Sequence, residues 1–168
     1  MRESLLEAVE ELRRRHYANS PALTLEIEIA RKRRVPEELL DFYSLCNGAL
    51  LGEGHDFRAP DGRWFRLSIP ALLDLKCAKE FGYISSHEPL YEQSANWWQI
   101  ADYGDGNWLA LDATNEGKGR IIDLFHETVG ETGFQMVVAT SLIDLLKRLL
   151  SADGVFWFED SFEALGWV

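Results

Sequence analysis

The sequence has few of the residues that build disulfide frameworks or zinc sites. Its 168 residues include two cysteines, Cys46 and Cys77, which form no Cys-x-x-Cys pair, and four histidines without the spacing of a metal site. A disulfide framework and a zinc site therefore have no support, and we expect both thiols to be buried like small apolar side chains. No cofactor and no metal are predicted.

Long apolar segments and catalytic motifs are missing as well. No stretch approaches the roughly 20 apolar residues that span a bilayer, and the N-terminus lacks the basic-then-apolar pattern of a secretory signal. We therefore expect a cytoplasmic protein without a membrane partner. The Gly-x-Ser-x-Gly and Walker motifs are also absent, so the sequence provides no support for catalysis.

Positive charge is scarce beyond the first 34 residues. The net charge is −11 at pH 7, and residues 1–34 carry eight basic and six acidic side chains, which leaves nine basic and 22 acidic side chains for residues 35–168. The run 31–34, Arg-Lys-Arg-Arg, is interpreted as a solvated helix end and not as a nucleic-acid patch. The acidic remainder disfavours nucleic acid and favours a basic protein partner, although solubility alone would also explain it.

Length and composition predict one domain over residues 1–168. Hydrophobic residues make up 46% of the chain and charged residues 27%, and there is no low-complexity tract or internal repeat. Within this domain we distinguish an N-terminal extension at 1–23, a core at 24–150, and an aromatic and acidic tail at 151–168. Residues 71–96 contain no motif that predicts a structure.

The most informative stretch is 97–125, which predicts three antiparallel strands joined by two turns. The turn 104–107, Gly-Asp-Gly-Asn, supplies the positive φ that a tight hairpin needs. Ile122 and Leu124 share one face of the third strand. Four further side chains alternate so that they line one buried face of the hairpin: Trp98, Ile100, Leu109 and Leu111.

Two helices are predicted in the N-terminal part of the chain. Ser4 and Glu7 fit a capping box at the start of the first helix, which continues until the break at 19–21. The segment Thr24 to Arg34 alternates like a strand, but its basic end suits a helix C-terminus, and we favour a helix.

Two further helices are predicted on either side of the strands. The first has Pro36 at its first position and stops at Asn47-Gly48. The second begins at Ser141, which forms a capping pair with Asp144, and Lys147 and Arg148 are placed near its negative end.

These segments, taken in order, resemble the SUKH superfamily. The matching pieces are VPEELLDFYSLCNG, a strand at 64–67, GDGNWLALD and VVATSLIDLLKRLL, and the resemblance covers about residues 24–150. The superfamily includes yeast regulators of cell-wall synthesis and bacterial immunity proteins of polymorphic toxin systems. The resemblance implies an α+β fold, with helices packed around a central, mainly antiparallel sheet, and a binding role without catalytic residues. The matched positions are structural: Pro36, Asn47, Gly48, Gly104, Gly106, Leu111 and Asp112.

The leading hypothesis is an immunity protein that neutralises a basic, nuclease-type toxin by occlusion. Nucleases must bind phosphate and are commonly basic, and acidic side chains of an inhibitor can mimic phosphate. Seven acidic residues are the candidate contacts: Glu53, Asp56, Asp102, Asp105, Glu159, Asp160 and Glu163.

Two other functions stay open. One is an intracellular regulator or scaffold that binds an endogenous protein. The other is a carbohydrate-active enzyme that uses Asp102, Asp105 or Asp112 beside a cluster of aromatic residues, which requires two carboxylates about 5–10 Å apart. We expect these aspartates to lie in turns and the tryptophans in the core.

Overall fold

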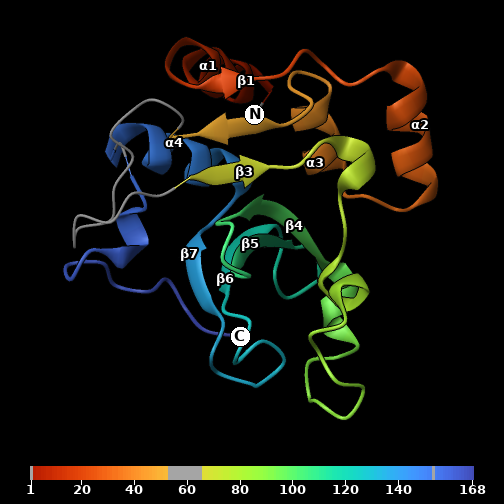
Figure 1. The fold of residues 1–168 in the computed structure, drawn as a ribbon, viewed down its shortest axis with the longest axis vertical. Helices are drawn as coiled ribbons and strands as arrows, with labels where there is room; N and C mark the ends of the chain where they lie inside the picture. Colours follow the sequence, from red (N-terminus) through yellow and green to blue (C-terminus); the bar gives the residue numbers. More distant parts are fainter. Residues whose placement is uncertain (1, 53–65, 153) are drawn as a thin grey trace.

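A seven-stranded antiparallel sheet, paired in the order of the chain, forms the centre of the described structure (Figure 1). The computed structural model describes residues 2–52, 66–152 and 154–168. The strands are β1 (Tyr17–Ala18), β2 (Ala49–Leu51), β3 (Leu67–Ile69), β4 (Trp97–Asp102), β5 (Trp108–Asp112), β6 (Arg120–Leu124) and β7 (Met136–Ala139). The α-helices are α1 (Arg2–Arg15), α2 (Thr24–Lys32), α3 (Glu37–Tyr43) and α4 (Leu142–Ala152). Short 3₁₀ helices are η1 (Leu72–Asp74), η2 (Ala78–Phe81), η3 (Gln93–Asn96) and η4 (Phe156–Phe158). The predicted α+β class is confirmed.

The predicted three-stranded meander is present as β4, β5 and β6. β5 pairs with β6 along its whole length, and β4 pairs with β5 apart from an irregularity between Gln99 and Ala101. Gly104 and Gly106 in the connecting turn have φ of +81° and +94°. Glycine adopts this left-handed conformation without the clash that a Cβ atom would cause, so the turn forms where the sequence placed it.

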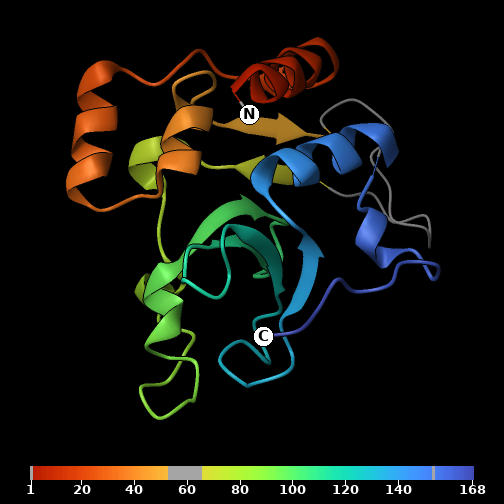
Figure 2. The same cartoon turned by 180° about the vertical axis from the view of Figure 1, so that it is seen from behind.

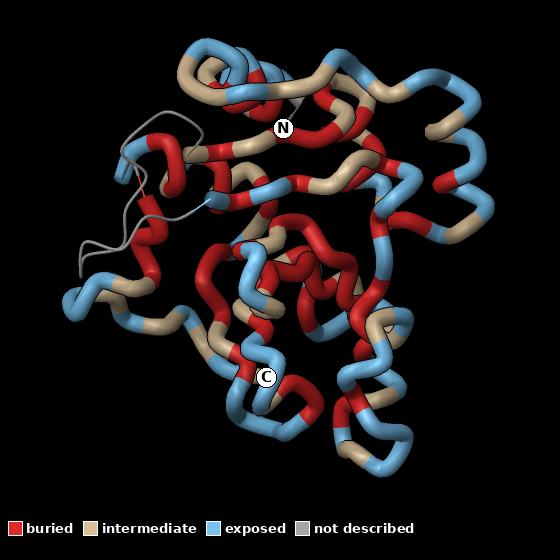
Figure 3. Tube along the Cα trace, in the orientation of Figure 1, coloured by how far each residue is buried: buried red, intermediate tan, exposed pale blue. Residues whose placement is uncertain are grey.

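Both faces of the sheet are buried, and different parts of the chain cover them (Figures 2 and 3). Helices α1, α3 and α4 pack on one face, where the four residues predicted to share it are buried: Trp98, Ile100, Leu109 and Leu111. The opposite face is covered by apolar side chains from segment 78–91. The sheet residues that pack there are Trp97, Trp108, Ala110, Ile122, Leu124 and Val137.

The N-terminal segment differs from the prediction at both ends. α1 already includes Arg2, so Ser4 lies inside the helix and does not cap it. A buried apolar stripe stabilises this helix by packing, which outweighs a local capping signal; the stripe is Leu5, Val9 and Leu12. At the other end α1 stops at Arg15, because residues 17 and 18 pair with β2 instead of continuing the helix to the break at 19–21.

The helix expected over Thr24–Arg34 is present as α2. It ends at Lys32, and Arg34 has a φ of +62°, which terminates the helical conformation. Arg33 donates a hydrogen bond of 2.7 Å to the Leu75 carbonyl. The basic run is therefore a helix end that is also tied to a distant segment.

The next helix is shorter than predicted. Pro36 is the capping residue of α3 and not its first helical residue, and the helix ends at Tyr43 before it reaches Asn47. The N–H groups of residues 45 and 46 both donate to the Phe42 carbonyl at 2.9 Å. This tightening into a turn ends the helix early.

α4 starts as predicted but is capped differently. The Ser141 hydroxyl accepts a 3.1 Å hydrogen bond from the Asp144 N–H, as a capping residue should. The Asp144 carboxylate, however, accepts from the Thr140 N–H at 2.9 Å. Since α4 extends to Ala152, Arg148 lies a turn before its end and pairs with Asp144 at 2.9 Å.

The strand expected at 64–67 begins later. β3 starts at Leu67 and ends at Ile69, while residues 64 and 65 lie outside the described residues. Residues 71–96, for which the sequence predicted nothing, connect β3 to β4 through η1, η2 and η3. No helix in the described ranges is long and apolar enough to cross a membrane.

The C-terminal tail lies along the outer edge of β7. The Leu165 N–H donates to the Val137 carbonyl at 3.0 Å, and the Val137 N–H donates to the Gly166 carbonyl at 2.9 Å. The Val168 N–H donates to the Gln135 carbonyl at 2.9 Å. The tail thus pairs with a strand edge that would otherwise present free backbone groups.

Candidate functional site

The sheet divides between β3 and β4. These strands share a single residue pair, Ser68 opposite Asp102. Pro70 follows β3 and has no N–H to continue the pairing, and β4 has its irregularity just beyond Gln99. The Gln99 N–H instead donates to the Lys76 carbonyl at 2.9 Å. The two strands therefore separate after one contact.

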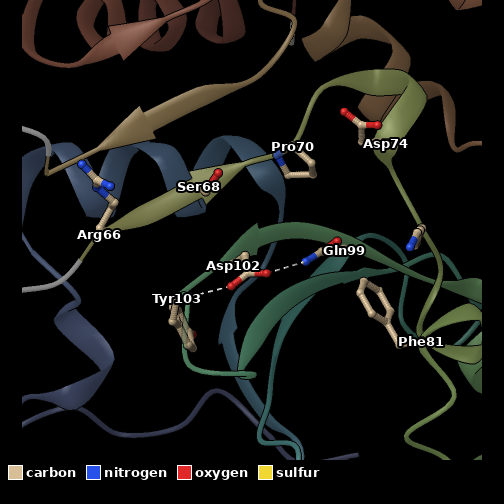
Figure 4. Close-up of a pocket in the computed structure, with 10 residues that line it drawn as sticks. Arg66, Ser68, Pro70, Asp74, Phe81, Gln99, Asp102 and Tyr103 are labelled. Carbon is tan, nitrogen blue, oxygen red and sulfur yellow. Dashed lines mark hydrogen bonds between the residues drawn. The ribbon is translucent and has the colours of Figure 1, made fainter.

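A pocket of about 410 Å³ opens at this division (Figure 4). Arg66 and Ser68 come from the side of β3, Gln99 and Asp102 come from β4, and Phe81 of η2 lies at the far end. The complete lining is Arg66, Ser68, Pro70, Asp74, Lys76, Phe81, Gln99, Asp102, Tyr103 and Gly104. The pocket contains one of the predicted acidic contacts, Asp102.

Asp102 and Gln99 form the polar floor of the pocket. The Asp102 carboxylate accepts the Gly104 N–H at 2.5 Å through Oδ1. Its Oδ2 accepts a long hydrogen bond of 3.4 Å from the side-chain amide of Gln99, which is only 6% exposed. A carboxylate and a buried amide thus lie next to each other on one strand.

Asn47, Gly48 and Tyr43 fix the opposite wall of the pocket, which follows the end of β3. Asn47 Oδ1 accepts the Leu72 N–H at 2.8 Å, and the Tyr43 hydroxyl donates to the Pro70 carbonyl at 3.0 Å. A Cβ atom at Gly48, whose φ is +93°, would lie 2.8 Å from the Ile69 carbonyl oxygen. These contacts fix the chain where it leaves β3.

The hairpin tip and the tail meet at Tyr103. Its hydroxyl donates to Asp123 Oδ1 at 2.9 Å, and its ring centroid lies 6.1 Å from that of Trp157 and 6.3 Å from that of Phe158. Because Phe158 directly precedes Glu159, this contact brings the acidic start of the tail to the acidic hairpin.

Asp123 is a half-buried acid that the sequence analysis did not select. Burial raises the pKa of its carboxyl to about 6, the hydrogen bond from Tyr103 opposes this rise, and the nearby charge of Asp105 adds to it. Its place in the alternation of β6 was visible in the sequence, but the proximity of Tyr103 depends on the hairpin register.

The predicted acidic contacts fall into three groups. Asp102 lies partly buried in the pocket, and Asp105 is exposed at the hairpin tip, where Oδ1 accepts the Asn107 N–H at 2.9 Å. Three are exposed on the tail: Glu159, Asp160 and Glu163. The remaining two, Glu53 and Asp56, lie outside the described residues.

The Asp112 carboxylate stabilises the connection between β5 and β6. It is buried, its carboxylate lies 2.9 Å from Arg120 Nη2, and it accepts the Thr114 hydroxyl at 2.7 Å. Asp102 pairs with Trp108, so Asp112 lies four residues further along β5, roughly 13 Å away at about 3.3 Å per residue. This separation exceeds the range that a glycosidase pair requires.

The remaining chemistry-bearing residues do not converge. Within residues 2–52, 66–152 and 154–168, no group of three or more His, Cys, Asp or Glu side chains is placed to hold a metal ion. Cys46 and Cys77 are both buried free thiols, as predicted, and burial raises the pKa of each.

Comparison with known proteins settles the family. The model of the SMI1/KNR4 family (SUKH-1) matches residues 19–148, from the end of β1 into α4. The chain belongs to this family. The SUKH resemblance inferred over residues 24–150 is thereby confirmed, and the division between β3 and β4 lies within the family region.

One relative is similar to this chain along enough of its length to support an argument about function. The chain is 29% identical over 142 residues to immunity protein YokJ of Bacillus subtilis (strain 168), which covers 82% of this chain and 79% of YokJ. No solved structure matches the chain.

Proposed function

We propose that this SUKH-1 protein is an immunity protein that binds a toxin protein and blocks it without catalysis of its own. The observation that carries the proposal is the similarity to an immunity protein along 82% of the chain. Function does not follow from fold alone, but a relative aligned along most of both chains narrows the range of roles.

We further propose that the toxin is basic and of the nuclease type, met in the cytoplasm. Residues 35–168 carry 22 acidic and nine basic side chains, a balance that attracts a protein built to bind phosphate. Occlusion of such a surface by carboxylates requires no reaction, because the acidic groups occupy the positions of phosphate groups.

The contact surface of the proposal combines the hairpin and the tail. The Tyr103–Phe158 contact connects the two segments, so their carboxylates can act together on one partner. The proposed contacts on this surface are Asp102, Asp105, Glu159, Asp160 and Glu163. Glu53 and Asp56, which lie outside the described residues, are proposed as further contacts.

Co-expression tests the proposal directly. Each polypeptide toxin domain encoded beside the gene for this protein is expressed in a susceptible bacterium with and without the protein, and growth and nucleic-acid integrity are measured. We expect rescue of growth with one toxin and a purified complex that dissociates more readily as salt rises. Capture of only endogenous proteins, without rescue from any neighbouring toxin, would favour the regulator or scaffold instead.

Charge reversal tests the contact surface. The double variant Asp105→Lys with Glu159→Lys should slow association with the captured toxin about tenfold or more at low salt, because steering depends on complementary charge. The control, Glu10→Lys with Glu28→Lys, makes the same change of charge on exposed positions of α1 and α2. Equal slowing in both variants would show that only net charge matters.

A further inference from the structure

The pocket between β3 and β4 contains more hydrogen-bond acceptors than the protein itself uses. Gln99 is only 6% exposed, and its side-chain Nε2 is oriented toward the Asp102 carboxylate. A carboxylate only accepts hydrogen bonds, so the amide nitrogen must be the atom beside it, and the oxygen Oε1 faces the opposite way. Figure 4 shows this oxygen directed from β4 toward the gap below Pro70.

This oxygen has no donor in the part of the chain that the structure describes. A ligand that donates a hydrogen bond can therefore take the place of water at this oxygen. Asp102 Oδ2 is only weakly satisfied by the 3.4 Å contact, and Asp74 adds a second carboxylate to the lining. The end of the pocket formed by Asp102 and Gln99 therefore suits a ligand that donates several hydrogen bonds and carries positive charge.

We propose that this pocket receives an arginine side chain of the bound toxin, held by Asp102 and Gln99. The inference rests on the proposed function and identifies the anchor of that interface. A guanidinium group offers five donors in a planar fork and accepts none, which matches a carboxylate and an amide oxygen side by side. The volume of about 410 Å³ lies within the range of small-ligand pockets and leaves room for water.

Two basic side chains of the protein, Arg66 and Lys76, also line the pocket, and they provide a test of the charge of the ligand. Both Arg66 and Lys76 are exposed, and Figure 4 shows the Arg66 side chain directed away from Asp102 and Gln99. Lys76 Nζ lies 5.7 Å from the centroid of the Phe81 ring. This ammonium group repels an incoming arginine, whereas it attracts an incoming carboxylate. Removing Lys76 thus has opposite effects for the two kinds of ligand.

A titration that needs no toxin tests the pocket itself. The full-length protein is titrated with Nα-acetyl-arginine amide and followed by ¹H–¹⁵N NMR, with the neutral Nα-acetyl-norleucine amide and the anionic Nα-acetyl-glutamate amide as matched probes. We expect shifts of the Gln99 side-chain amide and the Gly104 N–H with the arginine probe alone, saturating at millimolar concentration. Asp102→Asn should abolish them, Asp105→Asn should leave them unchanged, and Lys76→Ala should tighten binding.

The Asn substitution retains an oxygen that can accept the Gly104 N–H, so the turn is preserved in Asp102→Asn. With the toxin identified by co-expression, Asp102→Asn should weaken its affinity about 10- to 100-fold, mainly through faster dissociation, against a few-fold for Asp105→Asn. Gln99→Met, which removes the amide oxygen, should behave like Asp102→Asn.

The outcomes separate the two proposals. A toxin that binds with equal affinity to Asp102→Asn and Asp105→Asn would overturn the arginine pocket and leave the immunity function intact. Shifts with the glutamate probe, or weaker binding in Lys76→Ala, would also overturn it. If no neighbouring toxin binds, the immunity function fails, and the arginine titration alone then decides whether the pocket recognises this side chain.

Discussion

At the residue scale, Gly48 and Gly104 show how one residue type serves two different requirements. Both have left-handed backbone, with φ of +93° and +81°. A Cβ atom at Gly104 would meet nothing within 4 Å, whereas one at Gly48 would lie 2.8 Å from the Ile69 carbonyl oxygen and 3.1 Å from that of Pro70. Gly104 is thus required only by its turn, and Gly48 also by a close approach to the end of β3.

We therefore predict unequal costs for the same substitution. Gly104→Ala should lower the free energy of unfolding by about 1–2 kcal/mol, the cost of a side chain in left-handed backbone. Gly48→Ala should add about 1–3 kcal/mol to this, because two backbone carbonyls must move. Urea denaturation of the two variants at neutral pH measures the difference. Equal midpoints for the two variants would mean that the approach to β3 relaxes without cost.

The sequence predicted what single residues do locally and missed what they do at long range. Gly104 and Gly106 were identified as a hairpin turn, whereas Asn47-Gly48 was expected only to end a helix that in fact stops at Tyr43. That Asn47 Oδ1 accepts the N–H of Leu72, 25 residues later, has no local signature. Asp112 and Asp123 both occur in short strands, and only the register gives the first an arginine partner and the second a tyrosine.

At the element scale, the contact between the β4–β5 hairpin and the tail contains a titratable group. Because the pKa of Asp123 is about 6 in the folded chain and ordinarily 3.8, the folded state holds more protons between these pH values. The free energy of unfolding contributed by this group therefore falls as pH rises from about 4 to about 6, and is constant above this range.

Asp123→Asn should remove this dependence, since the amide oxygen still accepts the Tyr103 hydroxyl and carries no charge. The variant should match the wild type near pH 4 and exceed it by about 1–3 kcal/mol above pH 6.5. Denaturation in urea at a series of pH values, monitored by tryptophan fluorescence, gives the difference curve. A difference that does not change with pH would show that the carboxyl is well solvated.

Elements with a strong internal pattern were predicted well, and those that depend on a partner were not. The meander and the start of α4 follow from periodicity, turn residues and a capping residue, whereas α2 was predicted from its basic end against a strand-like alternation. The capping box at Ser4 was wrong because packing of α1 decides where that helix begins, and β1 was missed because its two residues are a strand only through pairing with β2. The edge pairing of the tail likewise depends on β7.

At the scale of the whole molecule, one sheet separates two apolar clusters, and two neighbouring tryptophans pack in different clusters. Trp98 packs with the helices and Trp97 with segment 78–91. If residues 1–168 form one domain, losing either cluster exposes a face of the same sheet, so both must unfold together. We predict coincident urea transitions by tryptophan fluorescence and far-ultraviolet circular dichroism. Two separated transitions would divide the chain into independent units.

The class of the fold could be predicted from the order of its segments, but the pocket between β3 and β4 could not. The pocket depends on a proline after β3 and an irregularity in β4, which lie 30 residues apart and have meaning only when the strands face each other. Asp102 was selected for its charge, while Gln99 was not selected at all, because an amide in a strand becomes informative only when it is buried beside a carboxylate.

The pairing of residues 165–168 with β7 has a consequence for the order of events during synthesis. Residues 165–168 leave the ribosome after β7 and the strands before it, so the sheet emerges while that edge still has unpaired backbone groups. Until the tail has emerged, each nascent chain presents an open strand to its neighbours on the same polysome. A stop codon that removes residues 165–168 would leave that edge permanently open.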